Sequence, residues 1–414
     1  MLEAATELVG RVLRFEEPAD AVVAAFFREH RALGARDRPV AADTVYAVLR
    51  RLEVFRHLAA SGSGKLERRL TLLGWQGSAD VRSAFITTEE AEWLGRCEQV
   101  ALESLPETVR DNLPEWIAAP LCRALGSEFR EWVASTEAPA PLDLRVNLLK
   151  ARREDVLEGL RAEGIEAAAT PWSPMGVRVS GKPSLQRSAL FTNGAVEVQD
   201  EGSQLLALIT GARRGEMVVD FCAGAGGKTL ALGAQMRNTG RLYAFDVSGH
   251  RLAQLKPRLE RAGVTNVHPT QIAHERDEHV ERLAGKVDRV LVDAPCTGIG
   301  TLRRHPDLKW RQTPAILAAL APKQRSILAA AARLVKPGGR LVYATCSVLE
   351  AENEDVAGDF DASSGASFTR LPVLEPLQRA QVGRPEALVS GNDMRLWTHR
   401  HGTDGFFAAA WQRR

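Results

Sequence analysis

The chain has 414 residues, and 45% of them are hydrophobic. A chain of this length exceeds what one hydrophobic core usually organises, so we expect two or three domains. Its 54 basic and 52 acidic residues give a formal net charge of +2, so a polyanion must be bound by local patches rather than a global field. No stretch approaches the roughly 20 apolar residues of a membrane span, and no export signal is visible. Five cysteines lie far apart without Cys-x-x-Cys spacing, which argues against a disulfide framework and a zinc site. We therefore expect a cytoplasmic protein with reduced thiols and no metal.

The first part of the chain, residues 1–138, has the pattern of an all-α domain. Apolar residues recur three and four apart in AADTVYAVLRRLEVFRHLAA (residues 41–60). Thr87 with Glu90 predicts a capping box at the start of a later helix. Several arginines of GARDRPVAADTVYAVLRR (residues 34–51) lie on a helical surface, which suits either a solvated face or RNA contact.

The prolines of TEAPAPLD (residues 136–143) break this pattern and mark a linker. After them LRVNLL predicts a strand, REDVLEGLRAEG a helix and GVRVS another strand. Residues 139–193 are therefore predicted to form a small α+β subdomain.

From residue 194 to 414, short β-rich runs alternate with helix-length segments. The runs are MVVDF, RLYAFD, RVLVDA and RLVYAT. Such alternation predicts an α/β domain with a parallel sheet, helices on both faces and right-handed crossovers.

A glycine-rich loop after the first of these strands predicts a nucleotide site. The loop contains Cys222, Ala223, Gly224, Ala225, Gly226, Gly227 and Lys228. Small residues let the backbone approach a nucleotide, and Asp246, ending the next strand, can accept hydrogen bonds from both ribose hydroxyls. A Walker A motif is excluded because Cys222 occupies the place of its first glycine, and Thr229 weakens a dinucleotide fingerprint. Asp220 before the loop favours S-adenosylmethionine, with a dinucleotide or a structural turn as alternatives.

Two cysteines follow two other predicted strands. Asp293 ends one strand, Cys296 comes shortly after it, and Cys346 follows the last strand. Because the carboxyl ends of parallel strands meet in one crevice, these groups can converge on the glycine loop. A lone cysteine is usually a small buried hydrophobe, but two at strand ends beside an acid favour a catalytic role.

These groups match the chemistry of methylation at carbon-5 of cytosine. A thiolate that adds to carbon-6 makes carbon-5 reactive toward a methyl sulfonium. Asp293 is placed to hydrogen-bond or protonate ring nitrogen-3, and a second cysteine can assist the last step. Lys228 either orients Asp293, lowers a thiol pKa or is simply solvated. Spacing alone does not say which cysteine attacks.

The same residues resemble the Sun/Nop family of RNA cytosine-5 methyltransferases, close to its Fmu or RsmB type. The matching segments are LRVN, VQDEGSQL, DFCAGAGGKT, the strand ending at Asp246, DAPCTGIGTLRRHPDLKW, KPGGRLVYATCSVLEAENE and HGTDGFF. The resemblance implies a Rossmann-like domain that holds S-adenosylmethionine with residues 222–228, Asp246 and Asp293. It also implies that Cys346 is the nucleophile and Cys296 assists product release. In the DNA cytosine methyltransferases a proline-cysteine pair supplies the nucleophile, which would reverse these roles.

Other parts of the chain resemble RNA-binding elements of the family. Residues 1–138 resemble a NusB-like RNA-binding domain, and residues 139–193 an RNA-recognition-like subdomain. The resemblance implies a monomeric enzyme acting on 16S ribosomal RNA, with a flipped or single-stranded cytosine and a covalent adduct. A basic run suits phosphate contact, with Trp310 either stacking on a base or packing in the structure. The run consists of Arg303, Arg304, His305, Lys309 and Arg311.

One segment departs from the family. The acid that contacts the cofactor adenine is missing from NVHPTQIAHERDE (residues 266–278), where Gln271, the Ile272 backbone and Asp277 are candidate replacements. Three alternative functions remain open: a transfer RNA cytosine-5 methyltransferase, a non-catalytic RNA-binding or ribosome assembly factor that keeps the fold, and a nicotinamide-dependent oxidoreductase.

Overall fold

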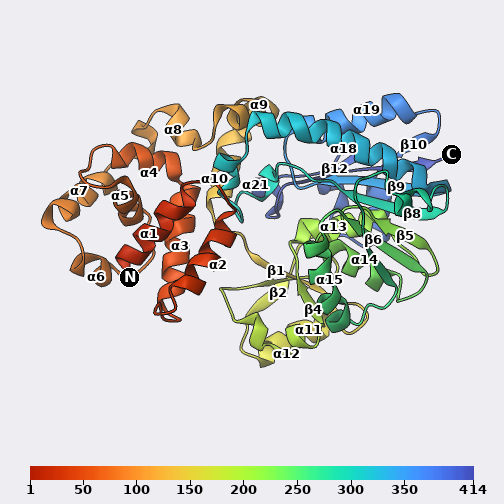
Figure 1. Ribbon diagram of the computed structural model, residues 1–414, viewed down its shortest axis with the longest axis horizontal. Coiled ribbons are helices and arrows are strands. Elements are labelled where there is room, and N and C mark those ends of the chain that lie inside the picture. The colour runs from red at the N-terminus through yellow and green to blue at the C-terminus, as the bar shows by residue number, and fades with distance from the viewer. The chain divides into compact units, whose positions relative to one another are not determined.

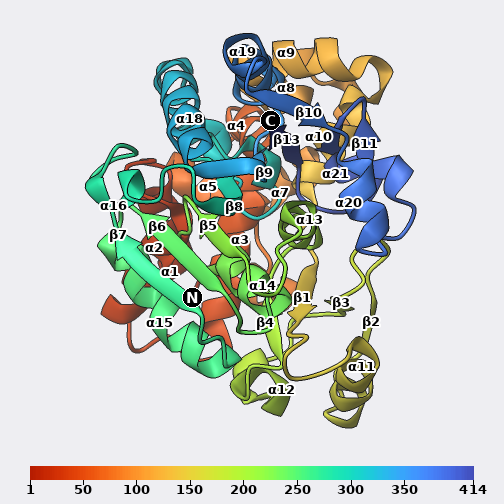
Figure 2. The same cartoon turned by 90° about the vertical axis from the view of Figure 1, so that its right-hand side faces the viewer.

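The chain folds into two compact units in the computed structural model, which describes residues 1–414. The first unit contains Met1–Pro139 and a distant segment, Thr301–Pro314, and the second contains Ala140–Gly300 and Ala315–Arg414. Figures 1 and 2 show helices in the first unit and two sheets with their helices in the second. Residues 301–314 lie within the range predicted for the catalytic domain, but in the structure they belong to the unit of the N-terminal helices.

The first unit is all-α. Its helices are α1 (Leu2–Val12), α2 (Ala19–Glu29), α3 (Asp37–Arg50), α4 (Leu52–Ala59), α5 (Leu66–Leu73), α6 (Ala79–Ala84), α7 (Thr88–Glu98), α8 (Glu107–Asp111), α9 (Glu115–Leu125), α10 (Phe129–Glu137) and α17 (Leu308–Arg311). The capping box at Thr87 and Glu90 is present at the start of α7. The apolar faces of α1 to α5 and of α7 meet in one core that includes Leu8, Phe26 and Leu49.

A small antiparallel sheet begins the second unit. Its order is β2 (Ala167–Ala169), β3 (Gly176–Val179), β1 (Leu142–Val146) and β4 (Val196–Val198). Helices α11 (Arg153–Ala162) and α12 (Ala189–Thr192) belong to the same region. The predicted strands at LRVNLL and GVRVS and the helix between them are therefore confirmed.

The large sheet carries the strands on which the site is built. Its order is β11 (Val389–Ser390), β12 (Asp393–Leu396), β13 (Phe406–Arg413), β9 (Val335–Thr345), β8 (Val287–Asp293), β5 (Met217–Asp220), β6 (Arg241–Asp246) and β7 (Val267–Gln271), with β10 (Phe368–Leu371) pairing with β13. The strands from β9 to β7 are parallel, as predicted, but β10 to β13 pair antiparallel. The predicted parallel sheet is therefore confirmed for β5 to β9, and antiparallel strands, which the sequence did not predict, extend it beyond β9; among these, β11 and β12 are joined by a turn too short for a helical crossover.

Both faces of the large sheet are buried. Val218 packs into the core on the side of α13 (Glu201–Thr210) and α14 (Gly227–Gln235), and Val219 into the core on the side of α18 (Pro314–Leu334) and α19 (Glu354–Ser364). Other helices of this unit are α15 (Gly249–Ala262), α16 (Glu278–Glu281), α20 (Leu374–Arg379) and α21 (Thr398–His401). Figure 2 shows the two layers on either side of the strands. This burial explains why the strands read as continuous apolar runs.

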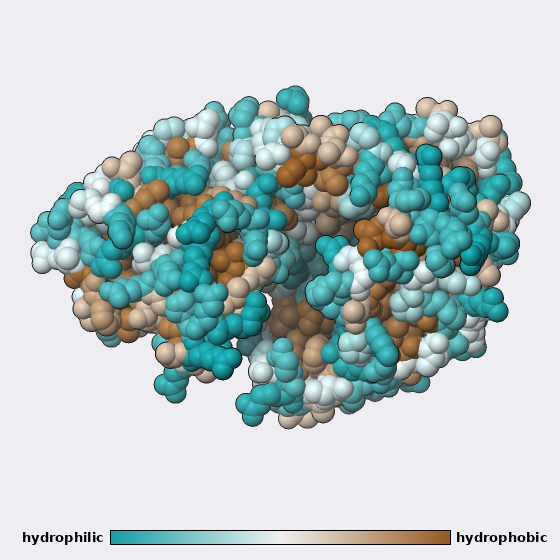
Figure 3. All heavy atoms as spheres, viewed as in Figure 1, coloured by the Kyte–Doolittle hydropathy of each residue, from teal (hydrophilic) through white to brown (hydrophobic).

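Polar residues dominate the face of the molecule shown in Figure 3, and apolar residues form separate groups on it. None of the helices has the length and apolar character needed to span a bilayer.

Candidate active site

The glycine loop connects β5 to α14. Gly226 caps α14 with a φ of 85°, a backbone conformation that favours glycine. A Cβ at this position would lie 2.0 Å from Cδ1 of Leu255 on α15. The loop can therefore lie close against its neighbouring helix only with glycine at this position.

Asp246, at the end of β6, is fixed by the loop itself. Its Oδ2 accepts a hydrogen bond from the Gly224 amide at 2.8 Å, and its Oδ1 accepts one from the Ser248 amide at 2.7 Å. The carboxylate is 7% exposed and lines a cavity at the carboxyl edge of the sheet. Its position beside a glycine loop suits a pair of ribose hydroxyls.

Asp220, at the end of β5, is buried and only half satisfied. Its Oδ2 accepts a hydrogen bond from the Thr229 hydroxyl at 2.7 Å, whereas its Oδ1 has no partner. Burial raises the pKa of this carboxyl to about 7. Because Asp220 lines the cavity, its unpartnered oxygen can accept a hydrogen bond from a bound molecule.

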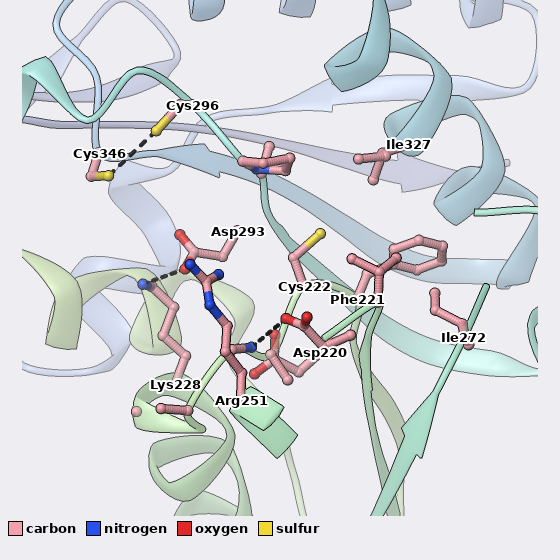
Figure 4. A pocket seen from close by; sticks show the side chains of 18 of the residues that line it. Asp220, Phe221, Cys222, Lys228, Arg251, Ile272, Asp293, Cys296, Ile327 and Cys346 are labelled. Carbon is pink, nitrogen blue, oxygen red and sulfur yellow. Dashed lines mark hydrogen bonds and ion pairs between the residues drawn. The ribbon is translucent and has the colours of Figure 1, made fainter. Parts of the chain in front are cut away.

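Lys228, in the first turn of α14, forms an ion pair with Asp293 at the end of β8. Their Nζ and Oδ2 atoms are 2.7 Å apart, and Figure 4 shows the pair beneath the two cysteines. Burial acts to lower the pKa of Lys228, but the Asp293 carboxylate offsets this, so the net pKa is raised. The lysine is therefore a fixed cation beside the thiols. Of the three interpretations of Lys228 from the sequence, the one in which it orients Asp293 fits this geometry.

The two cysteines face each other. Strands β8 and β9 are parallel neighbours, so Cys296, after β8, and Cys346, after β9, meet with their sulfur atoms 3.3 Å apart. The dashed line in Figure 4 marks this contact. The hydrogen bond with Cys346, followed by burial, raises the pKa of the Cys296 thiol well above its ordinary value. The two sulfurs are close enough to share one proton.

A cavity of about 650 Å³ unites these groups. It lies within the second unit, and its volume falls in the range of roughly 300–1,000 Å³ usual for cofactor sites. Every residue predicted to bind cofactor lines it except Gly226, and both cysteines line it as well. The lining residues predicted from the sequence are Cys222, Ala223, Gly224, Ala225, Gly227, Lys228, Asp246 and Asp293, with the two thiols of Cys296 and Cys346.

The segment after β7 contributes other residues to the cavity than most of those predicted to replace the missing acid. Ile272 lines it, but Gln271 donates instead to the carbonyl of Val247, and Asp277 caps α16. Glu275, which sequence reasoning missed, lines the cavity and accepts a hydrogen bond from the Ser326 hydroxyl at 2.6 Å. Three arginine and lysine residues of the lining, Arg251, Arg258 and Lys323, were also missed, because nothing in their sequence context distinguishes them from surface charges.

The basic run between residues 303 and 311 does not line the cavity. Lys309 is 0% exposed and donates to the carbonyls of Arg50 at 2.9 Å and Asn112 at 3.4 Å. Trp310 packs against the helical core and donates to the carbonyl of Leu49 at 3.5 Å. The expectation of phosphate contact was therefore wrong for Lys309, because its ammonium group donates to carbonyl groups inside the first unit. Of the two interpretations of Trp310, packing within the structure fits.

These residues fit S-adenosylmethionine. An adenosine ribose suits the carboxylate of Asp246, and a methionine ammonium group suits the unpartnered oxygen of Asp220. The open sheet, the glycine loop and the acids at the strand ends define a Rossmann-like methyltransferase, and S-adenosylmethionine is its cofactor.

Comparison with known proteins names the family. A family model described as 16S rRNA methyltransferase RsmB/F matches residues 207–412, and a model for the ferredoxin-like domain of RsmF/B-like methyltransferases matches residues 113–186. The chain belongs to the RsmB/F family of methyltransferases.

Relatives of known name have similar sequences. The chain is 34% identical over 313 residues to "Ribosomal RNA small subunit methyltransferase B" of Pseudomonas syringae pv. tomato, a match that covers 75% of this chain and 67% of that protein. It is 35% identical over 306 residues to "Probable ribosomal RNA small subunit methyltransferase B" of Bacillus subtilis, covering 73% of this chain and 66% of that protein. The chain thus matches about two thirds of the length of these relatives.

Solved structures share the fold. The crystal structure of PH0851 is 26% identical and superposes with a TM-score of 0.80, covering 99% of this chain and 98% of that one. A methyltransferase homologue from Pyrococcus horikoshii is 28% identical, with a TM-score of 0.63 and coverage of 75% and 100%. The first of these likenesses extends over both units.

Proposed function

We propose that this protein methylates carbon-5 of a cytosine in RNA, with the RNA of the small ribosomal subunit as its substrate. The observation that carries the proposal is the pair of thiols, 3.3 Å apart, on the wall of the cofactor cavity. Carbon-5 of cytosine needs covalent activation, whereas methylation of an amine or hydroxyl does not, so a nucleophilic cysteine supports this substrate class. The names of the relatives support ribosomal RNA.

The residues of the site have different roles in the proposed reaction. When bound, S-adenosylmethionine supplies an electrophilic methyl group. The Cys346 thiolate attacks carbon-6 of the cytosine, which makes carbon-5 nucleophilic. Asp293, held by Lys228, faces ring nitrogen-3 and stabilises the adduct through a hydrogen bond or proton transfer. Cys296 then assists the step in which carbon-5 loses its proton and the bond between carbon-6 and sulfur breaks.

Cysteine variants test this mechanism. Cys346→Ala should abolish both turnover and the covalent adduct, because no sulfur remains to attack. Cys296→Ala should form the adduct but release it slowly, giving a slowly migrating RNA–protein band on a denaturing gel. Cys122→Ala, at an exposed cysteine of α9 in the helical unit, is the matched control and should behave as the wild type. An adduct that accumulates with Cys346→Ala instead would overturn the assignment.

The substrate requires a separate test. Bisulfite sequencing of total RNA from cells with and without the gene should show one or a few methylated cytosines lost from the small-subunit ribosomal RNA. Loss of a site in transfer RNA would favour the alternative substrate. Binding of cofactor with no labelled RNA from methyl-tritiated cofactor would favour a non-catalytic assembly factor.

A further inference from the structure

Glu352 is a fully buried carboxylate in the turn η5 (Glu350–Glu352) that follows β9. Its Oε1 accepts hydrogen bonds from the Thr297 amide at 2.8 Å and from the side-chain amide of Gln324 at 3.0 Å. Its Oε2 accepts one from the Thr297 hydroxyl. None of these donors is charged, so no cation neutralises Glu352 at close range.

The carboxylate lies between the segments that carry the two thiols. Thr297, which donates to it twice, directly follows Cys296. The Thr297 hydroxyl is also 3.4 Å from the hydroxyl of Ser347, which directly follows Cys346. Glu352 therefore helps to hold the two cysteines in register.

The turn itself is firmly anchored. The Tyr343 hydroxyl donates to the Glu352 carbonyl at 2.6 Å, and the Asn353 side chain donates to the Ser347 carbonyl at 3.1 Å. Gln324, on α18, donates both to Glu352 and to the carbonyl of Pro295 at 2.9 Å. The position of the carboxylate is thus set by β9, α18 and the loop after β8 together.

Different charged groups act on the two thiols. Lys228, paired with Asp293, interacts electrostatically with Cys346. The negative charge of Glu352 acts on Cys296. Tyr343 also interacts with Cys296, but burial raises the pKa of its phenol, so it stays neutral. Cys346 therefore interacts with the lysine of an ion pair, whereas Cys296 interacts with a carboxylate that has no such partner.

We propose that Glu352 sets the direction of the hydrogen bond between the thiols, so that Cys296 is always the S–H donor and Cys346 carries the thiolate. The proposal rests on the proposed function and deepens it, because it gives a physical reason for the unequal roles of the cysteines. It is consistent with the raised pKa of the Cys296 thiol, to which the hydrogen bond with Cys346, burial and the charge of Glu352 contribute.

This arrangement serves both ends of the reaction. Before attack, the S–H group of Cys296 stabilises the Cys346 thiolate. During release, carbon-5 loses its proton to water, the bond between carbon-6 and the Cys346 sulfur breaks, and its electron pair returns to that sulfur. Cys296 then again donates to the departing thiolate, and neither sulfur is oxidised. Glu352 is thus a positioning residue that acts through Cys296.

The test is the alkylation of the full-length protein by iodoacetamide over a range of pH, with each cysteine peptide quantified by mass spectrometry. Iodoacetamide reacts with thiolates, so in the wild type Cys346 should be modified about tenfold faster than Cys296 near neutral pH. Glu352→Gln, which removes the charge but keeps the shape, should reduce this ratio at least about fivefold, mainly by speeding the reaction of Cys296. Glu350→Gln, an exposed residue of the same turn, should leave the ratio unchanged.

Several outcomes would overturn the proposal. One is faster modification of Cys296 than of Cys346 in the wild type, and another is an equal change in both rates in Glu352→Gln, which would mean a purely structural role. If Glu352→Gln does not fold, the wild-type pH profile decides, because Cys296 must then react only at higher pH than Cys346. The assay uses neither RNA nor cofactor, so its failure is distinguishable from failure to methylate RNA.

Discussion

Two buried lysines of this chain have pKa values shifted in opposite directions. Lys228 faces the Asp293 carboxylate in the cavity, and although burial acts to lower its pKa, the net pKa is raised. Lys309 donates its hydrogen bonds to neutral carbonyl groups in the helical unit, and burial lowers its pKa to about 8 although the charge of Glu137 acts to raise it. Both lysines are buried, so the charge of the hydrogen-bond partner decides whether the pKa of the lysine is raised or lowered. A lysine held as a permanent cation suits catalysis, whereas one satisfied by carbonyls contributes to packing.

The largest effect should come from Lys228→Met. Removing the ammonium leaves Asp293 without its ion pair and Cys346 without its nearby cation, so kcat should fall by about 100-fold or more while the fold persists. Single-turnover methylation with saturating cofactor measures this fall. Lys336→Met is the matched control, since Lys336 is exposed and pairs with Asp288 at the other end of the sheet. Retained activity in Lys228→Met would place the lysine outside the chemistry.

A smaller effect, on stability, should come from Lys309→Ala. The substitution leaves the buried Asn112 carbonyl unpaired, removes one of the two donors to the Arg50 carbonyl and opens a cavity, which costs about 2–5 kcal/mol. Hydrogen exchange should therefore accelerate in α3, whose end carries the Arg50 carbonyl, while cofactor binding in the other unit is retained. Lys65→Ala, at an exposed lysine of the same unit, should leave exchange unchanged. If exchange is equally unaffected in Lys309→Ala, the buried contacts carry no stability.

The smallest effect is a pH dependence that separates wild type from Lys309→Met. The folded-state pKa of Lys309 is about 8, below that of an unfolded lysine near about 10.4. The unfolded chain therefore binds this proton more tightly, and the wild type gains stability relative to Lys309→Met as pH rises from about 8 to about 10. Urea unfolding of both proteins at the two ends of this range measures the difference. A difference that does not grow with pH contradicts a buried, satisfied lysine.

Much of the catalytic unit follows from local sequence patterns. The strands around Asp220, Asp246 and Asp293 are short apolar runs that end in an acid, and a glycine loop follows the first of them. Because parallel strands share a carboxyl edge, the meeting of Cys296 with Cys346 could be predicted without a structure.

The rest depends on contacts between distant parts of the chain. Glu352 lies in the acidic string LEAENE, where nothing marks one acid as buried, and its partners Thr297 and Gln324 belong to other elements. Lys309 belongs to a run that looks like an exposed basic surface, and only the carbonyls of Arg50 and Asn112 give it a partner inside the helical unit. Neither the contacts of Glu352 nor those of Lys309 follow a periodic pattern or a motif, so they cannot be predicted from the sequence.

The split composition of the helical unit has a consequence for synthesis. Its helices up to α10 leave the ribosome first, but the segment Thr301–Pro314 that completes their packing emerges only after β1 to β8 have been made. Until then the Asn112 carbonyl lacks its Lys309 donor and the Arg50 carbonyl has only that of the Asn112 side chain. The packing of the amino-terminal helices is therefore completed only by a later part of the chain. Severing the chain after Pro139 would separate these helices from that segment permanently. The unit that comes first in the sequence is therefore among the last to be finished.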